Sequence, residues 1–479
     1  TIVLGDSLKT IAADYSGAFY ETPNITSVTF GNGIEEINHA FSGQQKLTKV
    51  ILGKKVKTIG NSAFNGCAAL ASFNFPETIT QLGSSAFSNT ALRTLTLPSK
   101  LTQIPEMAFY NCDSLRSIIL GKQITQIANN AFGECDSIRE VTVDNTIPEI
   151  INIASSFANM RKISFGVSVT EIPDNLLSNK SKLQEIVLGE NVTKIGRSAF
   201  SSTALRSFTF PAKVTTIGEE VFNTCTQLKK VKFNTVLTEI PSNTFNNCTA
   251  LDSIGLPNSI RKIGARAFNG CDSLRKVLLN AELTEISAYA FYNAGKKKLE
   301  SITIPANVKS IGEYAFAGCD TLSTIVLGAA IDSIAGYAFQ NCRNLKTITL
   351  PANTRILGSN LFEGTGISSL VIPDKVVSLN ETFRGLNEKL TSVTIGNGMT
   401  QLPEAMFSGF SQLKSAKLGS GLTKVPQNTF WGCSNLTNVT IGENVTNLDA
   451  YSFAYCTALK DLTIPEKVTV IHPDAFYQT

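Results

Sequence analysis

The chain has 479 residues, a length that ordinarily predicts about three domains of roughly 150 residues each unless the sequence repeats. Hydrophobic residues make up 43% and charged residues 17%, which argues against disorder and predicts a large buried core. The formal net charge is +4, too dilute over this length for a dedicated nucleic-acid binder. No stretch reaches the ~18 to 20 consecutive apolar residues of a membrane-spanning helix, so we expect none.

The first five residues, TIVLG, already have the pattern of the middle of a strand. We therefore expect the native termini, with any export signal or anchor, to lie beyond this sequence.

Phenylalanines set a period along the chain. Twenty of the 28 fall in one phase, mostly 22 or 23 residues apart, and Leu177 fills the vacant position between Phe157 and Phe200. This spacing predicts about 21 coils of about 23 residues. The phased residues are Phe19, Phe41, Phe64, Phe87, Phe109, Phe132, Phe157, Phe200, Phe222, Phe245, Phe268, Phe291, Phe316, Phe339, Phe362, Phe383, Phe407, Phe430, Phe453 and Phe476.

One complete repeat runs from Leu299 to Cys319 (LESITIPANVKSIGEYAFAGC). Alternation in Ile302-Thr303-Ile304 predicts a short strand that ends at Pro305, because proline cannot continue the ladder. A second apolar pair follows at Val308 and Ile311. The spacing from Ala315-Phe316 to Cys319 fits a short helical turn.

Such a unit cannot bury its apolar side alone, so the repeats must stack into a solenoid with one shared core. Successive strands then pair in parallel at about 4.8 Å. We expect the phenylalanine ladder to fill the core opposite the main strands. We also expect a single domain over residues 1–479.

The motif resembles the BspA-like class of leucine-rich repeats. Its I-G-x-x-A-F-x-x-C part recurs at Ile59 to Cys67, Ile263 to Cys271 and Ile311 to Cys319. The resemblance covers nearly the whole chain and implies a right-handed, curved leucine-rich-repeat solenoid. A parallel β-sheet would form one face, and short strands, turns and short helical segments the other. It also implies a surface-exposed or secreted protein of a host-associated microbe, in some relatives an adhesin.

Two regions break the rhythm, near residues 144–182 and 361–390. They could mark a change of curvature or a protruding loop, or simple sequence drift. Apolar strand positions such as Ile163, Phe165, Leu370 and Ile372 persist through both. Neither region is therefore expected to be a linker.

All ten cysteines lie three residues after a ladder phenylalanine, which predicts an inward-facing row. Equivalent atoms about 4.8 Å apart lie beyond the roughly 3.5 to 4.5 Å that disulfide Cβ atoms prefer, so we expect reduced thiols acting as small core residues. A straight row also cannot surround a metal ion tetrahedrally. They are Cys67, Cys112, Cys135, Cys225, Cys248, Cys271, Cys319, Cys342, Cys433 and Cys456.

Few residues could support catalysis. The only histidines, His39 and His472, belong to the second and last coils and cannot form one site. The phosphate-binding pattern G-x-x-x-x-G-K-S/T is absent. We therefore predict no enzymatic activity, no cofactor and no metal site.

Two surface features could recognise a partner. Thr29, Thr303 and Thr440 belong to an outward strand column that suits either a pleated ladder or binding of an extended ligand. A basic patch combines Lys230 and Lys232 with Lys276, and could attract an acidic protein or a sulfated or sialylated glycan. Its flanking residues are Lys229, Arg275 and Lys296 to Lys298.

Trp431, the only tryptophan, follows a ladder phenylalanine, as do Tyr110 and Tyr292. We expect it on the outer rim, where it could anchor an interface or pack on neighbouring coils. The sequence thus favours a non-enzymatic recognition scaffold that binds a protein or glycan of a host cell or extracellular matrix. A structural spacer or self-associating surface-layer component is the alternative.

Overall fold

A computed structural model describes residues 1–11, 17–19, 22–145, 157–296 and 298–479. It forms two compact units, Thr1–Val214 and Thr215–Thr479, and each is described by itself. The single domain over residues 1–479 stays a prediction.

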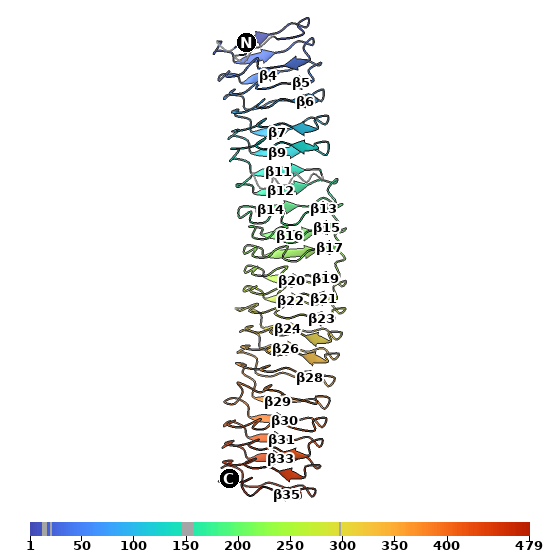
Figure 1. The fold of residues 1–479 in the computed structure, drawn as a ribbon, viewed down its shortest axis with the longest axis vertical. Helices are drawn as coiled ribbons and strands as arrows, with labels where there is room; N and C mark the ends of the chain where they lie inside the picture. Colours follow the sequence, from blue (N-terminus) through green and yellow to red (C-terminus); the bar gives the residue numbers. More distant parts are fainter. Residues whose placement is uncertain (12–16, 20–21, 146–156, 297) are drawn as a thin grey trace. The chain divides into compact units, whose positions relative to one another are not determined.

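The coils carry a longer main strand, a shorter second strand or both, at the positions that alternation in the sequence predicts. In β24 (Ser301–Thr303) the middle residue Ile302 is buried while its two neighbours are exposed. The coil then turns into β25 (Ser310–Ile311), where Ile311 is buried. Main strands such as β20 and β22 lie on one side of their coils, and the short strands β19 and β21 lie on the other (Figure 1).

The strands of unit 1 fall into these two classes. Its main strands are β1 (Ile2–Val3), β2 (Ser27–Thr29), β4 (Lys49–Ile51), β7 (Thr94–Thr96), β9 (Ser117–Leu120), β11 (Glu140–Val143), β12 (Lys162–Phe165), β14 (Glu185–Val187) and β16 (Ser207–Phe210). Its short strands are β3 (Glu36–Ile37), β5 (Thr58–Ile59), β6 (Gln81–Leu82), β8 (Gln103–Ile104), β10 (Gln126–Ile127), β13 (Glu171–Ile172) and β15 (Lys194–Ile195).

Unit 2 repeats the arrangement. Its main strands are β18 (Lys230–Phe233), β20 (Ser253–Gly255), β22 (Lys276–Leu278), β24, β26 (Thr324–Val326), β29 (Ser369–Val371), β30 (Ser392–Thr394), β31 (Ser415–Lys417) and β33 (Asn438–Thr440). Its short strands are β17 (Thr216–Ile217), β19 (Glu239–Ile240), β21 (Lys262–Ile263), β23 (Glu285–Ile286), β25, β27 (Ser333–Ile334), β28 (Ile356–Leu357), β32 (Lys424–Val425), β34 (Asn447–Leu448) and β35 (Val470–Ile471).

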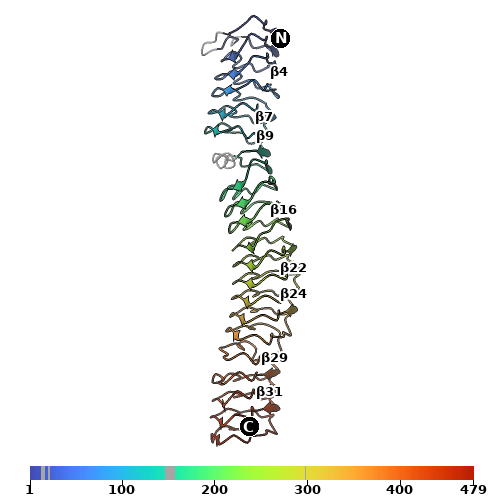
Figure 2. The same ribbon diagram turned by 90° about the vertical axis from the view of Figure 1, so that its right-hand side faces the viewer.

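Neighbouring coils pair in parallel, one repeat apart. Ile302 of β24 faces Ile325 of β26, and Ile311 of β25 faces Ile334 of β27. This register stacks like residues in columns, so every inward side chain meets its counterpart from the next coil. Figure 2 shows β22 and β24 together on one edge of the stacked coils. The parallel solenoid predicted from the repeat is confirmed.

The phenylalanine ladder fills the core as predicted. The rings of Phe245 and Phe268 stack with centroids 5.4 Å apart, and Phe268 and Phe291 stack at 5.1 Å. In unit 1 Phe87 also meets Phe73, which lies between β5 and β6, with centroids 4.7 Å apart. Leu177 is fully buried in the ladder position that lacks an aromatic ring.

The predicted helical segments are absent from the described residues, which contain strands and turns but no helix. Most turns that carry a ladder residue have two positions with positive φ, illustrated by Tyr314 at 53° and Gly318 at 72° on either side of Phe316. A right-handed helix needs negative φ throughout, so these residues make tight turns instead.

The irregular regions keep their strands where the structure describes them. Near 144–182, Ile163 and Phe165 belong to β12 and pair with Val141 and Val143 of β11. Residues 146–156 of that region lie outside the described residues. Near 361–390, Leu370 belongs to β29 and pairs with Val393 of β30.

Candidate functional site

The cysteine row is buried, and none of its ten members forms a disulfide. Cysteine suits this position for more than its small size, because its thiol donates a hydrogen bond to a main-chain carbonyl of the preceding coil. Cys271 Sγ donates to the carbonyl of Phe245 at 3.2 Å, and Cys319 Sγ donates to that of Phe291 at 3.2 Å. Thr479 uses its hydroxyl in the same way, donating to the carbonyl of Phe453 at 2.6 Å. The row therefore serves packing and satisfies ladder carbonyls.

Burial also keeps three of these thiols protonated. It raises the pKa of Cys67, Cys319 and Cys456 to about 12 in each case. A nucleophilic cysteine instead needs a lowered pKa and partial exposure. These three side chains are thus poor candidates for catalysis.

The two histidines lie in different units. His39 follows β3 in a turn with φ of 46°, and His472 follows β35. His472 Nδ1 accepts a hydrogen bond from the main-chain N–H of Asp474 at 3.2 Å. Over the described ranges, no cluster of three or more His, Cys, Asp or Glu side chains could hold a metal ion. Those ranges also contain no helix suited to crossing a membrane.

The structure brings the predicted lysines together on the main-strand face of unit 2. Lys230 of β18 faces Ser253 of β20, which in turn faces Lys276 of β22. Lys232 lies two residues along β18, and all three lysines are exposed. None of the three forms an ion pair with another described residue. We call Lys230, Lys232 and Lys276 the basic patch.

Arg275 behaves differently from the lysines beside it. Its Nε and Nη2 donate to the two carboxylate oxygens of Asp252 at 2.6 and 2.5 Å. This hydrogen bonding lowers the pKa of Asp252, and Lys298 and Lys230 lower it further through their charges. Sequence reasoning missed Asp252, although it precedes Arg275 by one repeat. Lys297 lies outside the described residues.

The structure does not join Trp431 to the basic patch. The tryptophan lies in the turn before β33 and is 43% exposed. Its ring meets Tyr455 edge-on with centroids 5.6 Å apart, and Tyr455 meets Tyr477 in the same way at 5.6 Å. Trp431 therefore belongs to an aromatic cluster on the turn side of unit 2, where both predicted roles remain open.

A second aromatic row on the turns was not predicted. The rings of Tyr289, Tyr314 and Tyr337 stack with centroids 4.9 and 4.5 Å apart. The Arg266 guanidinium covers the outer face of the Tyr289 ring at 4.6 Å. These residues all occupy the first position of the turn that has a positive φ. A glycine there would have indicated the positive φ in the sequence, whereas tyrosine and arginine do not. Stacking covers the ring faces, so the row presents mostly edges and hydroxyls.

The outward strand column is less uniform than its threonines suggested. Exposed aliphatic side chains share it, including Ile119, Leu278 and Val371, which are 43%, 56% and 60% exposed. The column is thus a mixed hydroxyl and aliphatic surface.

Comparisons with known proteins agree with this geometry. The model for the BspA-type leucine-rich-repeat region matches residues 1–116, 102–229, 199–297, 294–385 and 380–479. No curated protein sequence matches the chain.

Similar solved structures include three bacterial proteins. A leucine-rich repeat protein from Bacteroides ovatus is 20% identical, over 87% of this chain and 86% of its own, with a TM-score of 0.30. One from Eubacterium ventriosum is 22% identical over 79% and 94%, with a TM-score of 0.31. A leucine-rich cell-surface protein from Faecalibacterium prausnitzii is 23% identical over 80% and 83%, with a TM-score of 0.28. Because the family model matches along its length, this chain belongs to the BspA-type leucine-rich-repeat family.

Proposed function

We propose that the protein is a non-enzymatic recognition scaffold, displayed on a cell surface or secreted, that binds an acidic protein or glycan of a host cell or matrix. The observation that carries the proposal is the basic patch. Lys230, Lys232 and Lys276 extend from paired strands of one sheet. Their charges stay available to a partner because they are exposed and not spent on ion pairs among the described residues.

The surroundings favour a broad, anionic ligand over a small one. Gly255, between Lys232 and Leu278 in the outward column, has no side chain, and a Cβ there would meet only the Leu278 side chain at 4.0 Å. An extended polymer could therefore lie across the strands without obstruction. Electrostatic attraction would steer it and fade with salt over a Debye length of about 8 Å.

The test compares two triple variants of the full chain. One replaces Lys230, Lys232 and Lys276 with glutamate, and the control replaces the exposed lysines Lys49, Lys414 and Lys417 in the same way. Both change the net charge equally. We expect the patch variant to bind heparin-derived and sialylated oligosaccharides at least about tenfold more weakly at low salt, and the control to bind almost normally. Equal losses would show that net charge, and not the patch, drives binding.

The same experiment separates the alternative role as a spacer. If neither class of acidic oligosaccharide nor an array of matrix proteins binds at low salt, recognition through the patch is wrong. Concentration-dependent assembly in light scattering would then support self-association. Trp431→Ala, made separately, tests whether that ring anchors a partner.

A further inference from the structure

The short-strand ladder of unit 1 is interrupted at Pro105. In the neighbouring coils, the residue after each short strand donates to the preceding coil: Gly83 N–H bonds Ile59 O at 2.7 Å and Ala128 N–H bonds Ile104 O at 2.8 Å. Pro105 occupies this position after β8 and has no N–H to donate. The sheet β3-β5-β6 therefore ends at β6, and β8 pairs only with β10.

The interruption extends to the residue before the strand. Elsewhere Thr80 N–H donates to Lys57 O, and Thr125 N–H donates to Thr102 O, both at 2.8 Å. Within the described ranges no corresponding bond links Thr102 N–H to Thr80 O. Main-chain donors and acceptors thus remain available on an open face of the protein, where a ligand can reach them.

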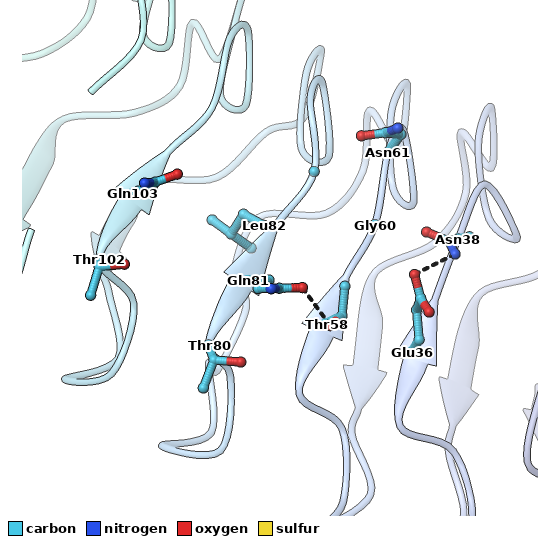
Figure 3. A pocket seen from close by; sticks show the side chains of 11 residues that line it. Glu36, Asn38, Thr58, Gly60, Asn61, Thr80, Gln81, Leu82, Thr102 and Gln103 are labelled. Atoms are coloured by element: carbon cyan, nitrogen blue, oxygen red, sulfur yellow. Dashed lines mark hydrogen bonds between the residues drawn. The ribbon is translucent and has the colours of Figure 1, made fainter. Parts of the chain in front are cut away.

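A polar hollow of about 450 Å³ lies over this break. Figure 3 shows Thr80 and Gln81 on one coil and Thr102 and Gln103 on the next, on the same side. Asn61 also lines the hollow, and Glu36 is the one charged residue of the lining. Volumes of this order are typical of small-ligand sites.

The side chains of the hollow retain hydrogen-bonding capacity. Gln103 makes no side-chain hydrogen bond to any described residue, and Gln81 uses only Oε1, which accepts weakly from Thr58 Oγ1 at 3.4 Å. Glu36 Oε1 accepts from Asn38 Nδ2 at 2.6 Å and leaves Oε2 available. The hollow therefore offers amide donors, amide acceptors and hydroxyls, but no cation.

At the positions equivalent to Gln81 and Gln103, some other coils carry charged side chains that pair with each other. Lys194 pairs with Glu171 at 3.7 Å in unit 1, and Lys262 pairs with Glu285 at 3.1 Å in unit 2. In these two pairs of coils the charged side chains bind each other, whereas Gln103 has no side-chain partner among the described residues and Gln81 has only the weak bond from Thr58. The hollow therefore differs from these ion-paired coils in presenting neutral amides with remaining hydrogen-bonding capacity.

We propose that this hollow binds a neutral carbohydrate. A sugar presents many hydroxyls, each both donor and acceptor, which match free amides, threonine hydroxyls and unpaired main-chain groups. A phosphate or carboxylate would need a cation, which the lining lacks, and would be repelled by Glu36. The site is separate from the basic patch and does not depend on it.

The test titrates the full chain with four neutral trisaccharides, built from glucose, galactose, mannose or N-acetylglucosamine, by calorimetry and saturation-transfer NMR. At least one should bind, with an affinity that hardly changes between about 0.05 and 0.5 M salt. The double variant Gln81→Ala/Gln103→Ala should weaken binding at least about tenfold. The matched control is Gln126→Ala, in the same column one coil beyond the hollow.

Three outcomes would overturn the proposal: no binding of any of the four sugars up to about 10 mM, equal binding by the double variant, or equal loss in the Gln126→Ala control. The lysine variants keep the two proposals distinguishable. Replacing Lys230, Lys232 and Lys276 should leave neutral-sugar binding unchanged, and Gln81→Ala/Gln103→Ala should leave acidic-oligosaccharide binding unchanged.

Discussion

The short strands form an unbroken ladder in one region of the chain and an interrupted one in another. In unit 2, β19, β21, β23, β25, β27 and β28 form one sheet of six strands. In unit 1 the ladder stops between β6 and β8. The coils on both sides of that stop pack into the same core. The ladder differs there because Pro105 lacks the main-chain N–H that Gly83 and Ala128 donate in their coils. At Pro105 the residue after the short strand thus prevents the ladder from continuing to the coil before it.

Proline marks this position repeatedly. Pro105, Pro173, Pro241 and Pro426 directly follow β8, β13, β19 and β32, and each of these strands is the first of its sheet in chain order. Because proline lacks the N–H, the ladder can continue after it but cannot connect to the coil before it. The repeat therefore contains a built-in means of dividing its sheet without disturbing the core.

The largest expected effect concerns the phenylalanine core of each region. Phe268→Ala in unit 2 and Phe87→Ala in unit 1 should each lower the free energy of unfolding by about 3 to 5 kcal/mol, because both rings are fully buried in stacks. Urea denaturation followed by hydrogen exchange measures the loss in each unit. The control is Phe268→Leu, which places at this position the side chain that Leu177 supplies in its own coil, and it should lose less. A markedly smaller loss for Phe87→Ala would mean that the two regions differ in their core as well.

The next effect concerns pH. Burial raises the pKa of Cys319 and Cys456 from 9.0 to about 12, so folding favours the protonated thiol. Stability should therefore be complete below about pH 9 and fall by about 1.4 kcal/mol per pH unit for each such thiol between pH 9 and 12. Urea midpoints at pH 8 and pH 10 measure this. Cys319→Ala should reduce the alkaline slope, and an unchanged slope would contradict the assignment.

The smallest effect tests the ladder itself. Ala335 N–H donates to Ile311 O at 2.9 Å within the continuous sheet. Ala335→Pro should remove that bond and lower the free energy of unfolding by about 1 to 3 kcal/mol. Amides of the coil should then exchange faster, while Ala335→Ser, which keeps the N–H, should change little. No change in exchange with proline would contradict the role assigned to Pro105.

Much of the fold follows from the sequence. The spacing of phenylalanine and cysteine and the alternation of Ile302-Thr303-Ile304 predicted the stacked coils and buried columns. The helical turn was wrong, because side chains such as Tyr314 and Arg266 give no sign of the positive φ that they adopt.

The surface was less predictable, although some signals were present. Asp252 precedes Arg275 by 23 residues, one repeat, so a search for opposite charges at that offset would have found their pairing. The change from Ile-Gly to Ile-Pro at Pro105 would likewise have indicated the ladder break. Which amides stay unpaired in the hollow depends on side-chain directions, and periodicity does not contain that information.

Backbone amide exchange tests most directly the claim that Pro105 opens the ladder. In the free protein, the amides of Thr102 and Gln103 should exchange much faster than those of Thr125 and Gln126, which donate to Thr102 O at 2.8 and 3.3 Å. Addition of a bound neutral trisaccharide should slow the first pair only. Equal protection of the two pairs in the free protein would contradict the account.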